Sequence, residues 1–197
     1  MEDSILTLVE KIPQLENGNR VILGIDGLSR SGKTTFANKV KQALQEKNVP
    51  LQIFHIDDYI VERKRRYNTE KEEWFEYYNL QWDVEWLKNN FFQKLKISNE
   101  LHLPTYDNHS DTHRVKSVTL PKTCFIIVEG VFLQRSEWKR FYDFMLYIDC
   151  PREKRFNRES VSTQSNMEKF KNRYWKAEDY YIKTEAPIKQ ADLVLGN

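Results

Sequence analysis

A glycine-rich segment near the N-terminus has the residue types and spacing of a loop that binds phosphates. Two glycines bracket four residues and are followed by lysine and threonine, in the order Gly-Leu-Ser-Arg-Ser-Gly-Lys-Thr. In such a loop the backbone N–H groups and the N-terminus of the following helix face the phosphate oxygens. Lys33 then contacts the β- and γ-phosphates and Thr34 reaches Mg²⁺, so we expect ATP and Mg²⁺ to bind. The predicted nucleotide-binding residues are Gly27, Leu28, Ser29, Arg30, Ser31, Gly32, Lys33, Thr34 and Thr35.

Acidic residues follow two other apolar segments. Asp57 and Asp58 come after residues 51–56, and Glu129 comes after residues 125–128. A carboxylate beside the γ-phosphate can accept the proton of an attacking hydroxyl, which makes Asp57 the candidate base. Asp58 is the alternative candidate for the base. Its other possible roles are to hold the metal or to cap the following helix. We expect Glu129 to hold a water of the Mg²⁺ ion that Thr34 binds, and its alternative is an ordinary ion pair with a surface lysine.

Two arginines, Arg155 and Arg158, lie three residues apart after Pro151, a residue that favours the first turn of a helix. Side chains with this spacing share a helix face. Phosphoryl transfer spreads charge over the equatorial oxygens, and fixed cations stabilise that charge. The candidate catalytic residues are therefore Asp57, Lys33, Arg155 and Arg158, and a solvated basic helix face is the alternative for the arginine pair.

The elements that must position these side chains alternate along the chain. Apolar runs at residues 21–25, 51–56, 124–128, 144–148 and 192–195 predict buried strands, and helices are predicted at 4–16, from 33 to the Pro50 region, and at 138–142. Strands of this kind separated by helices indicate a parallel sheet with helices on both faces. The fold class expected is α/β, with the three-layer architecture of P-loop NTPases and a small lid.

A single domain over residues 1–197 is expected from the length of the chain. Residues 60–120 form a substrate-side insertion, with an aromatic helical part at 74–96 and a polar loop at 104–114. Helical spacing of Trp74, Tyr78, Trp82 and Trp86 favours core packing for that stripe, and stacking on a planar base is the alternative. Residues 158–176 are polar and helix-prone, which suits a mobile lid.

Composition excludes some classes of function. The chain has 31 Lys and Arg against 29 Asp and Glu, a net charge of +2, which is far from the basic excess of a nucleic-acid-binding protein. No apolar run approaches the roughly 20 residues that span a bilayer, and the N-terminus is acidic. We therefore expect a cytoplasmic protein with a small-molecule hydroxyl acceptor, no nucleic-acid partner and no membrane partner. An oligomer is compatible with the sequence but has no support in it.

Taken together, these motifs resemble the uridine kinase and phosphoribulokinase family of P-loop kinases. The resemblance covers most of the chain: residues 24–35, Asp57-Asp58-Tyr59, Pro104-Thr105-Tyr106-Asp107, residues 127–130, residues 147–149 with Arg155 and Arg158, and residues 191–194. It implies transfer of the γ-phosphate of ATP to a hydroxyl of a nucleoside of the uridine or cytidine kind. It also implies an arginine-bearing lid. The substrate-binding residues that the resemblance implies are Asp57, Tyr59, Asp83, Tyr106, His113 and Arg158.

The acceptor side departs from the family pattern. Only Trp82-Asp83 matches the end of the acidic and aromatic segment that grips a nucleoside, and His113 aligns only with two inserted residues. The alternative is a kinase of the same fold for a sugar, a pantothenate-like or a glycerate-like acceptor. A nucleotide-hydrolysing switch without an acceptor is less favoured, because the sequence has no Asn-Lys-x-Asp motif for guanine.

Overall fold

The computed structural model describes residues 5, 8 and 14–197 of the chain. The helix predicted at residues 4–16 lies mostly outside the described residues, although Ile5 and Leu8 are both helical. Among the described residues, none of the helices has the length and apolar character that crossing a membrane requires.

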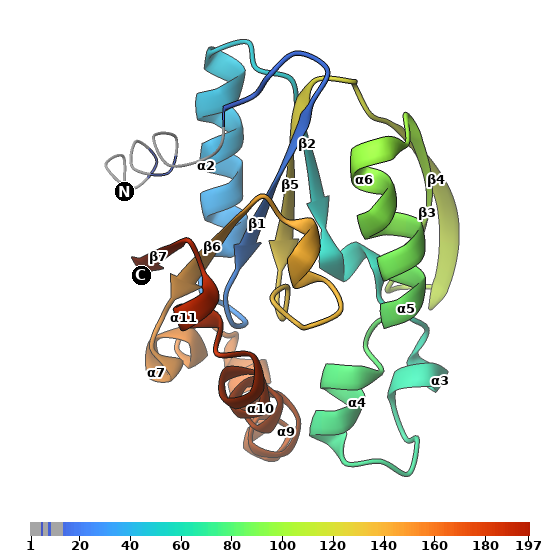
Figure 1. Ribbon diagram of the computed structural model, residues 1–197. Helices are drawn as coiled ribbons and strands as arrows, with labels where there is room; N and C mark the ends of the chain where they lie inside the picture. Colours follow the sequence, from blue (N-terminus) through green and yellow to red (C-terminus); the bar gives the residue numbers. More distant parts are fainter. Residues whose placement is uncertain (1–4, 6–7, 9–13) are drawn as a thin grey trace.

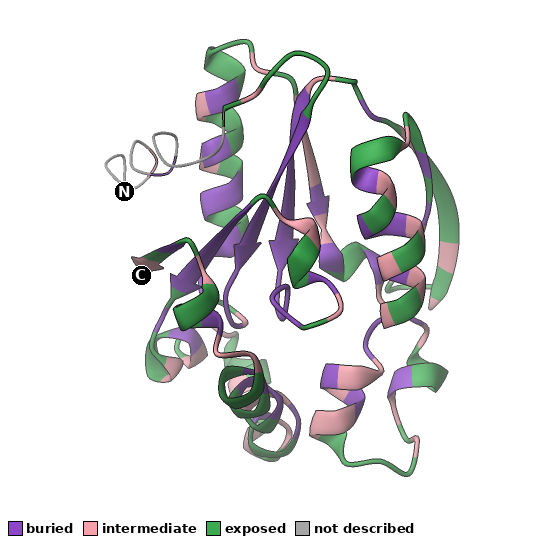
Figure 2. Cartoon of the chain, in the orientation of Figure 1, coloured by how far each residue is buried: buried purple, intermediate pink, exposed green. Residues whose placement is uncertain are grey.

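The centre of the fold is a parallel sheet with the strand order β2-β5-β1-β6-β7. Its strands are β1 (Arg20–Asp26), β2 (Leu51–His55), β5 (Cys124–Gly130), β6 (Phe144–Asp149) and β7 (Leu193–Gly196). Every residue of β1 and β5 is buried (Figure 2), as expected for strands with both faces covered. Because the strands are parallel, their carboxyl ends meet at one edge of the sheet (Figure 1).

Helices cover both faces of this sheet. On one face, α2 (Lys33–Glu46) packs Phe36, Val40 and Leu44 against the strands. On the other face lie α5 (Val84–Leu87), a π-helical turn (Lys88–Phe92) and α6 (Gln93–Ile97), with Phe91 and Phe92 fully buried. The predicted three-layer α/β architecture is therefore confirmed.

The insertion after β2 differs from the sequence prediction in two places. A 3₁₀ turn (Ile56–Tyr59), α3 (Arg63–Arg66) and α4 (Glu73–Asn79) precede α5, so the predicted helical part is broken at residues 80–83. The prediction of a polar loop at 104–114 was wrong, because this segment belongs to the antiparallel hairpin of β3 (Glu100–Asp107) and β4 (Thr112–Thr119). Most of β4 is exposed, so its polar residues read as a loop.

The aromatic stripe of the insertion packs in the core, as its helical spacing predicts. Tyr78 and Trp82 are 5% and 2% exposed, and Trp74 and Trp86 pack against the same cluster. Trp82 also donates an indole hydrogen bond of 2.9 Å to the backbone carbonyl of Ile56. The insertion is thereby fixed to the segment that directly follows β2.

Short helices join β6 to β7 at the carboxyl edge of the sheet. They are α7 (Arg152–Phe156), α8 (Val161–Gln164), α9 (Met167–Lys169), a π-helical turn (Phe170–Trp175), α10 (Lys176–Glu185) and α11 (Pro187–Gln190). A 3₁₀ turn (Lys139–Phe141) lies within the region 138–142 predicted as a short helix. The region predicted as a lid, residues 158–176, therefore contains α8 and the first part of a helix that runs without a break from α9 through the π-helical turn into α10, beside the carboxyl ends of the strands (Figure 1).

Candidate functional site

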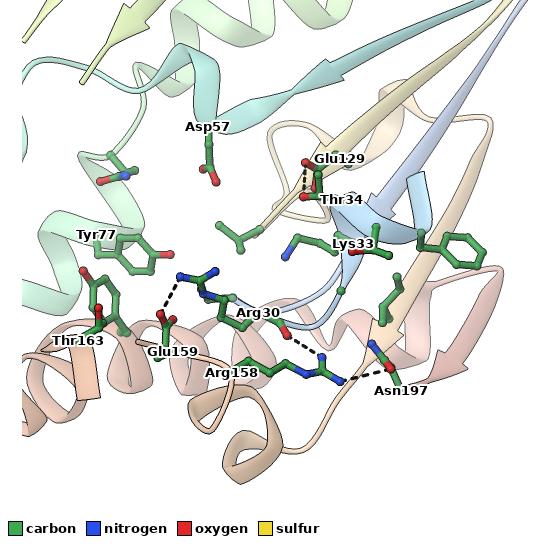
Figure 3. A pocket seen from close by; sticks show the side chains of 18 of the residues that line it. Arg30, Lys33, Thr34, Asp57, Tyr77, Glu129, Arg158, Glu159, Thr163 and Asn197 are labelled. Atoms are coloured by element: carbon green, nitrogen blue, oxygen red, sulfur yellow. Dashed lines mark hydrogen bonds and ion pairs between the residues drawn. The ribbon is translucent and has the colours of Figure 1, made fainter. Parts of the chain in front are cut away.

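A cavity of about 1100 Å³ opens where β1, β2 and β5 end. Residues from the glycine-rich loop, from the turn after β2, from β5 and from the segment 158–176 line it (Figure 3). Of the predicted site residues, it brings together Ser29, Arg30, Gly32, Lys33, Thr34, Thr35, Asp57, Glu129 and Arg158. Segments that are far apart in the sequence thus share one concave surface.

The glycine-rich loop adopts a backbone that needs its two glycines. Gly27 has a φ of 151° and Gly32 a φ of 101°, a region that other residues rarely adopt. A Cβ on Gly27 would lie 2.7 Å from the carbonyl oxygen of Ile148. The buried hydroxyl of Ser31 has no hydrogen-bond partner among the described residues. The loop therefore fits a polyanion, since it combines an unsatisfied donor with the N-terminus of α2.

The start of this loop is tied to a buried carboxylate. Asp26 is fully buried and accepts hydrogen bonds from the backbone N–H of Gly27 (2.7 Å), the amide of Gln134 (3.0 Å) and the hydroxyl of Tyr181 (2.5 Å). Burial raises the pKa of Asp26 above its ordinary value, against the lowering effect of these bonds. Tyr181 belongs to α10, so this network joins the loop to the segment that follows the predicted lid.

Lys33 is the cation at the floor of the cavity and is 8% exposed. Its ammonium donates a hydrogen bond of 2.9 Å to the carbonyl of Leu28 within the loop. Burial lowers the pKa of Lys33, while the charges of Glu129 and Asp57 act in the opposite direction. A buried ammonium at the phosphate loop is suited to pairing with an anionic phosphate, and the two carboxylates favour its charged form.

Thr34 and Glu129 lie side by side, as the predicted metal site requires (Figure 3). The hydroxyl of Thr34 donates a 3.0 Å hydrogen bond to Oε1 of Glu129, and Nδ1 of His55 lies 2.5 Å from the same oxygen. Although burial opposes it, hydrogen bonding by His55 and the charge of Lys33 hold the pKa of Glu129 below its ordinary value. An ionised carboxylate beside a hydroxyl is a donor set that Mg²⁺ accepts, with water and phosphate as its other ligands.

His55 was not singled out in the sequence, although it is two residues before Asp57. Its hydrogen bond with Glu129 raises the pKa of His55.

Among the described residues, no group of three or more His, Cys, Asp or Glu side chains is arranged to hold a metal ion. Thr34 and Glu129 therefore fit a metal that takes most of its ligands from water and a bound phosphate.

Asp57 directs its carboxylate into the cavity from the turn that follows β2 (Figure 3). The side chain is open to the cavity, and the surrounding protein nevertheless limits its hydration. This desolvation raises the pKa of Asp57, and the nearby charge of Lys33 lowers it in part. Asp58 is not among the residues that line the cavity. Of the two adjacent carboxylates, Asp57 is the one that reaches the cavity.

Arg30 and Arg158 connect the loop to the segment 158–176. Arg30 forms an ion pair of 2.9 Å with Glu159, and Nη1 of Arg158 donates a 2.8 Å hydrogen bond to the carbonyl of Arg30. Both arginines line the cavity. These contacts join the loop to the start of the segment predicted as a lid.

Arg155 does not share the exposed face of Arg158. The helix α7 ends at Phe156, and Arg155 is 4% exposed. Its guanidinium forms a bidentate pair with Glu178, with N–O distances of 2.7 and 2.9 Å, and donates a 3.0 Å hydrogen bond to the carbonyl of Ser29. It is not among the residues that line the cavity. The structure therefore connects Arg155 to the backbone of the loop.

The other predicted acceptor-binding residues are engaged with the protein and do not line the cavity. Tyr59 is 8% exposed and packs in the core. Asp83 caps α5 through the N–H of Trp86 and pairs with an arginine. The hydroxyl of Tyr106 donates a 2.7 Å hydrogen bond to Asp111.

His113 lies opposite Tyr106 in the hairpin register. Its Nδ1 is 3.1 Å from Glu62, and its Nε2 is 2.9 Å from the carbonyl of Ile60.

The cavity is lined instead by residues that the sequence did not single out as an acceptor site. They are Ile60, Tyr67, Tyr77, Gln81, Val131, Glu159, Thr163, Phe170, Tyr174 and Asn197. Two sequence signals pointed to part of this set: the cluster of aromatic residues near Trp74 and the predicted lid at residues 158–176.

Comparisons with known proteins agree with this geometry. The model of the Phosphoribulokinase / Uridine kinase family matches residues 22–195. Uridine kinase of Borrelia duttonii is 31% identical over 143 residues, which are 70% of this chain and 64% of that protein. The match therefore spans less than two thirds of that relative. Uridine kinase of Macrococcus caseolyticus is 30% identical over 155 residues, 71% of this chain and 67% of its own.

Solved structures have the same architecture. A structure described as a possible uridine kinase from Bacillus stearothermophilus has 52% sequence identity and a TM-score of 0.87, and 98% of each chain is covered. A putative fructose transport system kinase from Silicibacter has a TM-score of 0.78 at 16% identity, covers 98% of this chain and 97% of its own, and shows a shared fold alone. Because the family model matches residues 22–195 and the chain has the phosphate loop, the chain belongs to the Phosphoribulokinase / Uridine kinase family.

Proposed function

We propose that the protein is an ATP-dependent kinase that transfers the γ-phosphate to a hydroxyl of a nucleoside of the uridine or cytidine kind. The observation that carries this proposal is that Asp57 and Lys33, from different strand ends, line one cavity and interact electrostatically. A carboxylate facing the cation of a phosphate loop has the position that a base for an acceptor hydroxyl needs.

The loop and its neighbours hold the donor. Backbone N–H groups of the glycine-rich loop and the ammonium of Lys33 bind the phosphates of ATP. Thr34 and Glu129 hold Mg²⁺, which when bound neutralises charge on the β- and γ-phosphates. Arg158 lines the same cavity, and its cation is available to the transferred phosphoryl group.

Asp57 orients the acceptor and takes its proton. Its raised pKa makes it a stronger base than an ordinary aspartate, and the charge of Lys33 acts against part of that rise. Arg30 and Glu159 close one side of the cavity, which limits the access of water to the phosphate.

The relatives named as uridine kinases support a nucleoside as the acceptor. A sugar, a pantothenate-like or a glycerate-like molecule is the alternative acceptor within the same chemistry. The acceptor must be tested because the segment before Trp82-Asp83 and the loop before His113 depart from the family pattern. In addition, the side chains of Asp83, Tyr106 and His113 bind other parts of the protein.

The test measures ADP release from Mg²⁺-ATP with nucleosides, sugars and small hydroxy acids as acceptors. Uridine or cytidine should raise ADP release above the acceptor-free level and yield a phosphorylated product. In Asp57→Asn, kcat should fall by about 100-fold or more with ATP affinity retained, whereas Asp58→Asn should keep most of the activity. ATP hydrolysis that no acceptor stimulates would contradict the proposal and favour a switch.

A further inference from the structure

Gln81 is a buried polar side chain on the wall of the cavity that none of the roles above uses. It lies between α4 and α5, is 9% exposed and lines the same cavity as Asp57. Its amide oxygen is buried and has no hydrogen-bond partner among the described residues. A buried polar atom without a partner destabilises a protein, and such atoms are rare in native proteins.

The backbone around Gln81 is fixed beside the segment that carries Asp57. The carbonyl of Gln81 accepts a 3.0 Å hydrogen bond from the N–H of Val61. The next residue, Trp82, forms a β-bridge with Ile60 and is 2% exposed. The position of Gln81 is therefore set by the core on one side, and its side chain meets the cavity on the other.

The charges along the cavity distinguish its two ends. Among the described residues, the cations that line it are Arg30, Lys33 and Arg158. The first two belong to the phosphate loop, and Arg158 donates to the carbonyl of Arg30. Two buried arginines lie behind the end near Gln81 without lining the cavity: Arg66 bonds to the carbonyl of Val61, and Arg173 pairs with Glu76. Among the described residues, an acceptor with a carboxylate or phosphate of its own would therefore meet no further cation on the lining of the cavity. Binding such an anion without a partner is unfavourable, so this end favours an uncharged molecule.

The remaining walls near this end are aromatic or apolar. Tyr67, Tyr77 and Tyr174 line the cavity, and the rings of Tyr77 and Tyr174 contact each other edge to face at 5.0 Å. Burial raises the pKa of Tyr77, and the charge of Asp57 adds to this rise. Tyr77 and the candidate base Asp57 line the same cavity (Figure 3). Aromatic walls with one unpaired amide suit a small neutral ligand that has a polar edge.

We propose that the carboxamide of Gln81 binds the phosphate acceptor, accepting a hydrogen bond from an N–H or O–H of an uncharged acceptor. This inference rests on the proposed kinase function and deepens it by naming the residue that selects the acceptor. A carboxamide presents a hydrogen-bond donor, its N–H, beside a hydrogen-bond acceptor, its oxygen. Both the edge of a pyrimidine base and a pair of sugar hydroxyls match that pattern, so the acceptor panel has to separate these two sources.

The experiment compares the wild-type protein with Gln81→Leu and Gln81→Ala. Steady-state kinetics are measured with Mg²⁺-ATP and with uridine, cytidine, unphosphorylated sugars, and anionic acceptors such as glycerate, pantothenate and a sugar phosphate. Thermal unfolding of each variant is measured alongside. The matched control is Gln45→Leu, because Gln45 is an exposed residue of α2 that does not line the cavity.

The expected result has three parts. In Gln81→Leu, kcat/KM for the acceptor falls by about 10-fold or more, the magnitude of one lost hydrogen bond, while the KM for ATP stays within about twofold. The melting temperature is unchanged or higher, because a buried oxygen without a partner has been removed. Gln45→Leu changes neither quantity. Nucleosides as the preferred substrates identify a base edge, and sugars identify a hydroxyl pair.

Three results would overturn the inference. An unchanged kcat/KM in Gln81→Leu would mean that the amide does not touch the acceptor. A large fall in melting temperature would mean that the amide is bonded within the protein. Preference for an anionic acceptor would refute the neutral site. Failure of the proposed function is distinguishable, because the wild-type protein itself would then transfer phosphate to no acceptor, and this inference would fall with it.

Discussion

The buried pair of Arg155 and Glu178 gives the sharpest prediction. The two side chains are 4% and 2% exposed, and two N–O contacts of 2.7 and 2.9 Å join them. Arg155 also donates to the carbonyl of Ser29, and the Glu178 carboxylate accepts a hydrogen bond from the backbone of Ser29. The pair therefore holds one residue of the phosphate loop by both of its backbone polar groups.

Replacing Glu178 by Gln leaves the guanidinium of Arg155 buried without a counter-charge. Breaking a buried pair in this way costs about 3 to 5 kcal/mol. For a chain of this size, each kcal/mol lowers the melting temperature by about 2 to 4 °C, so a fall of roughly 6 to 20 °C is expected. Calorimetry and urea unfolding measure the change. The control is Asp179→Asn, which removes an exposed ion pair with Arg152 between the same two helices and should cost at most about 1 kcal/mol.

The double variant Arg155→Met/Glu178→Leu separates a positioning role from a catalytic one. Replacing both charges by apolar side chains should recover at least half of the lost stability, because no isolated charge remains. If Arg155 acts through the loop, the stable double variant retains kcat within about 10-fold and shows mainly a higher KM for ATP. A stable double variant with kcat reduced by more than about 100-fold and unchanged ATP affinity would refute this reasoning and make Arg155 a catalytic residue.

Three further predictions concern the same cavity. Burial raises the pKa of Asp57 above 3.8, so activity should be lost as the pH falls through that raised pKa; an acidic limb of the kcat/KM profile below pH 4 would contradict this. Glu129→Gln should raise the Mg²⁺ concentration for half-maximal activity by about 10-fold or more, measured by titration at constant ATP. Gly27→Ala should abolish ATP binding in calorimetry, because its methyl group would lie 2.7 Å from the backbone oxygen of Ile148.

Much of the fold could be predicted because the sequence carries strong local signals. The buried strands are continuous apolar runs, and the amphipathic spacing of Phe36, Val40 and Leu44 indicates a helix packed on one face. The hairpin at residues 100–119 was missed for a physical reason. A two-stranded ladder with one solvated strand needs no apolar alternation along β4, so its stability comes from pairing with β3, which is not visible in either segment alone.

The donor side of the candidate site follows from the sequence by itself, because the glycines, Lys33 and Thr34 form a contiguous motif whose backbone does the binding. Only the tertiary structure decided which other side chains reach the cavity. It brings Asp57 and Glu129 to the loop because β5 lies between β2 and β1 in a parallel sheet, so that the three strands end at the same edge. It directs Arg155 into the core with Glu178, and it leaves Gln81 on the wall. Such choices depend on packing between distant segments, which residue types and spacing do not specify.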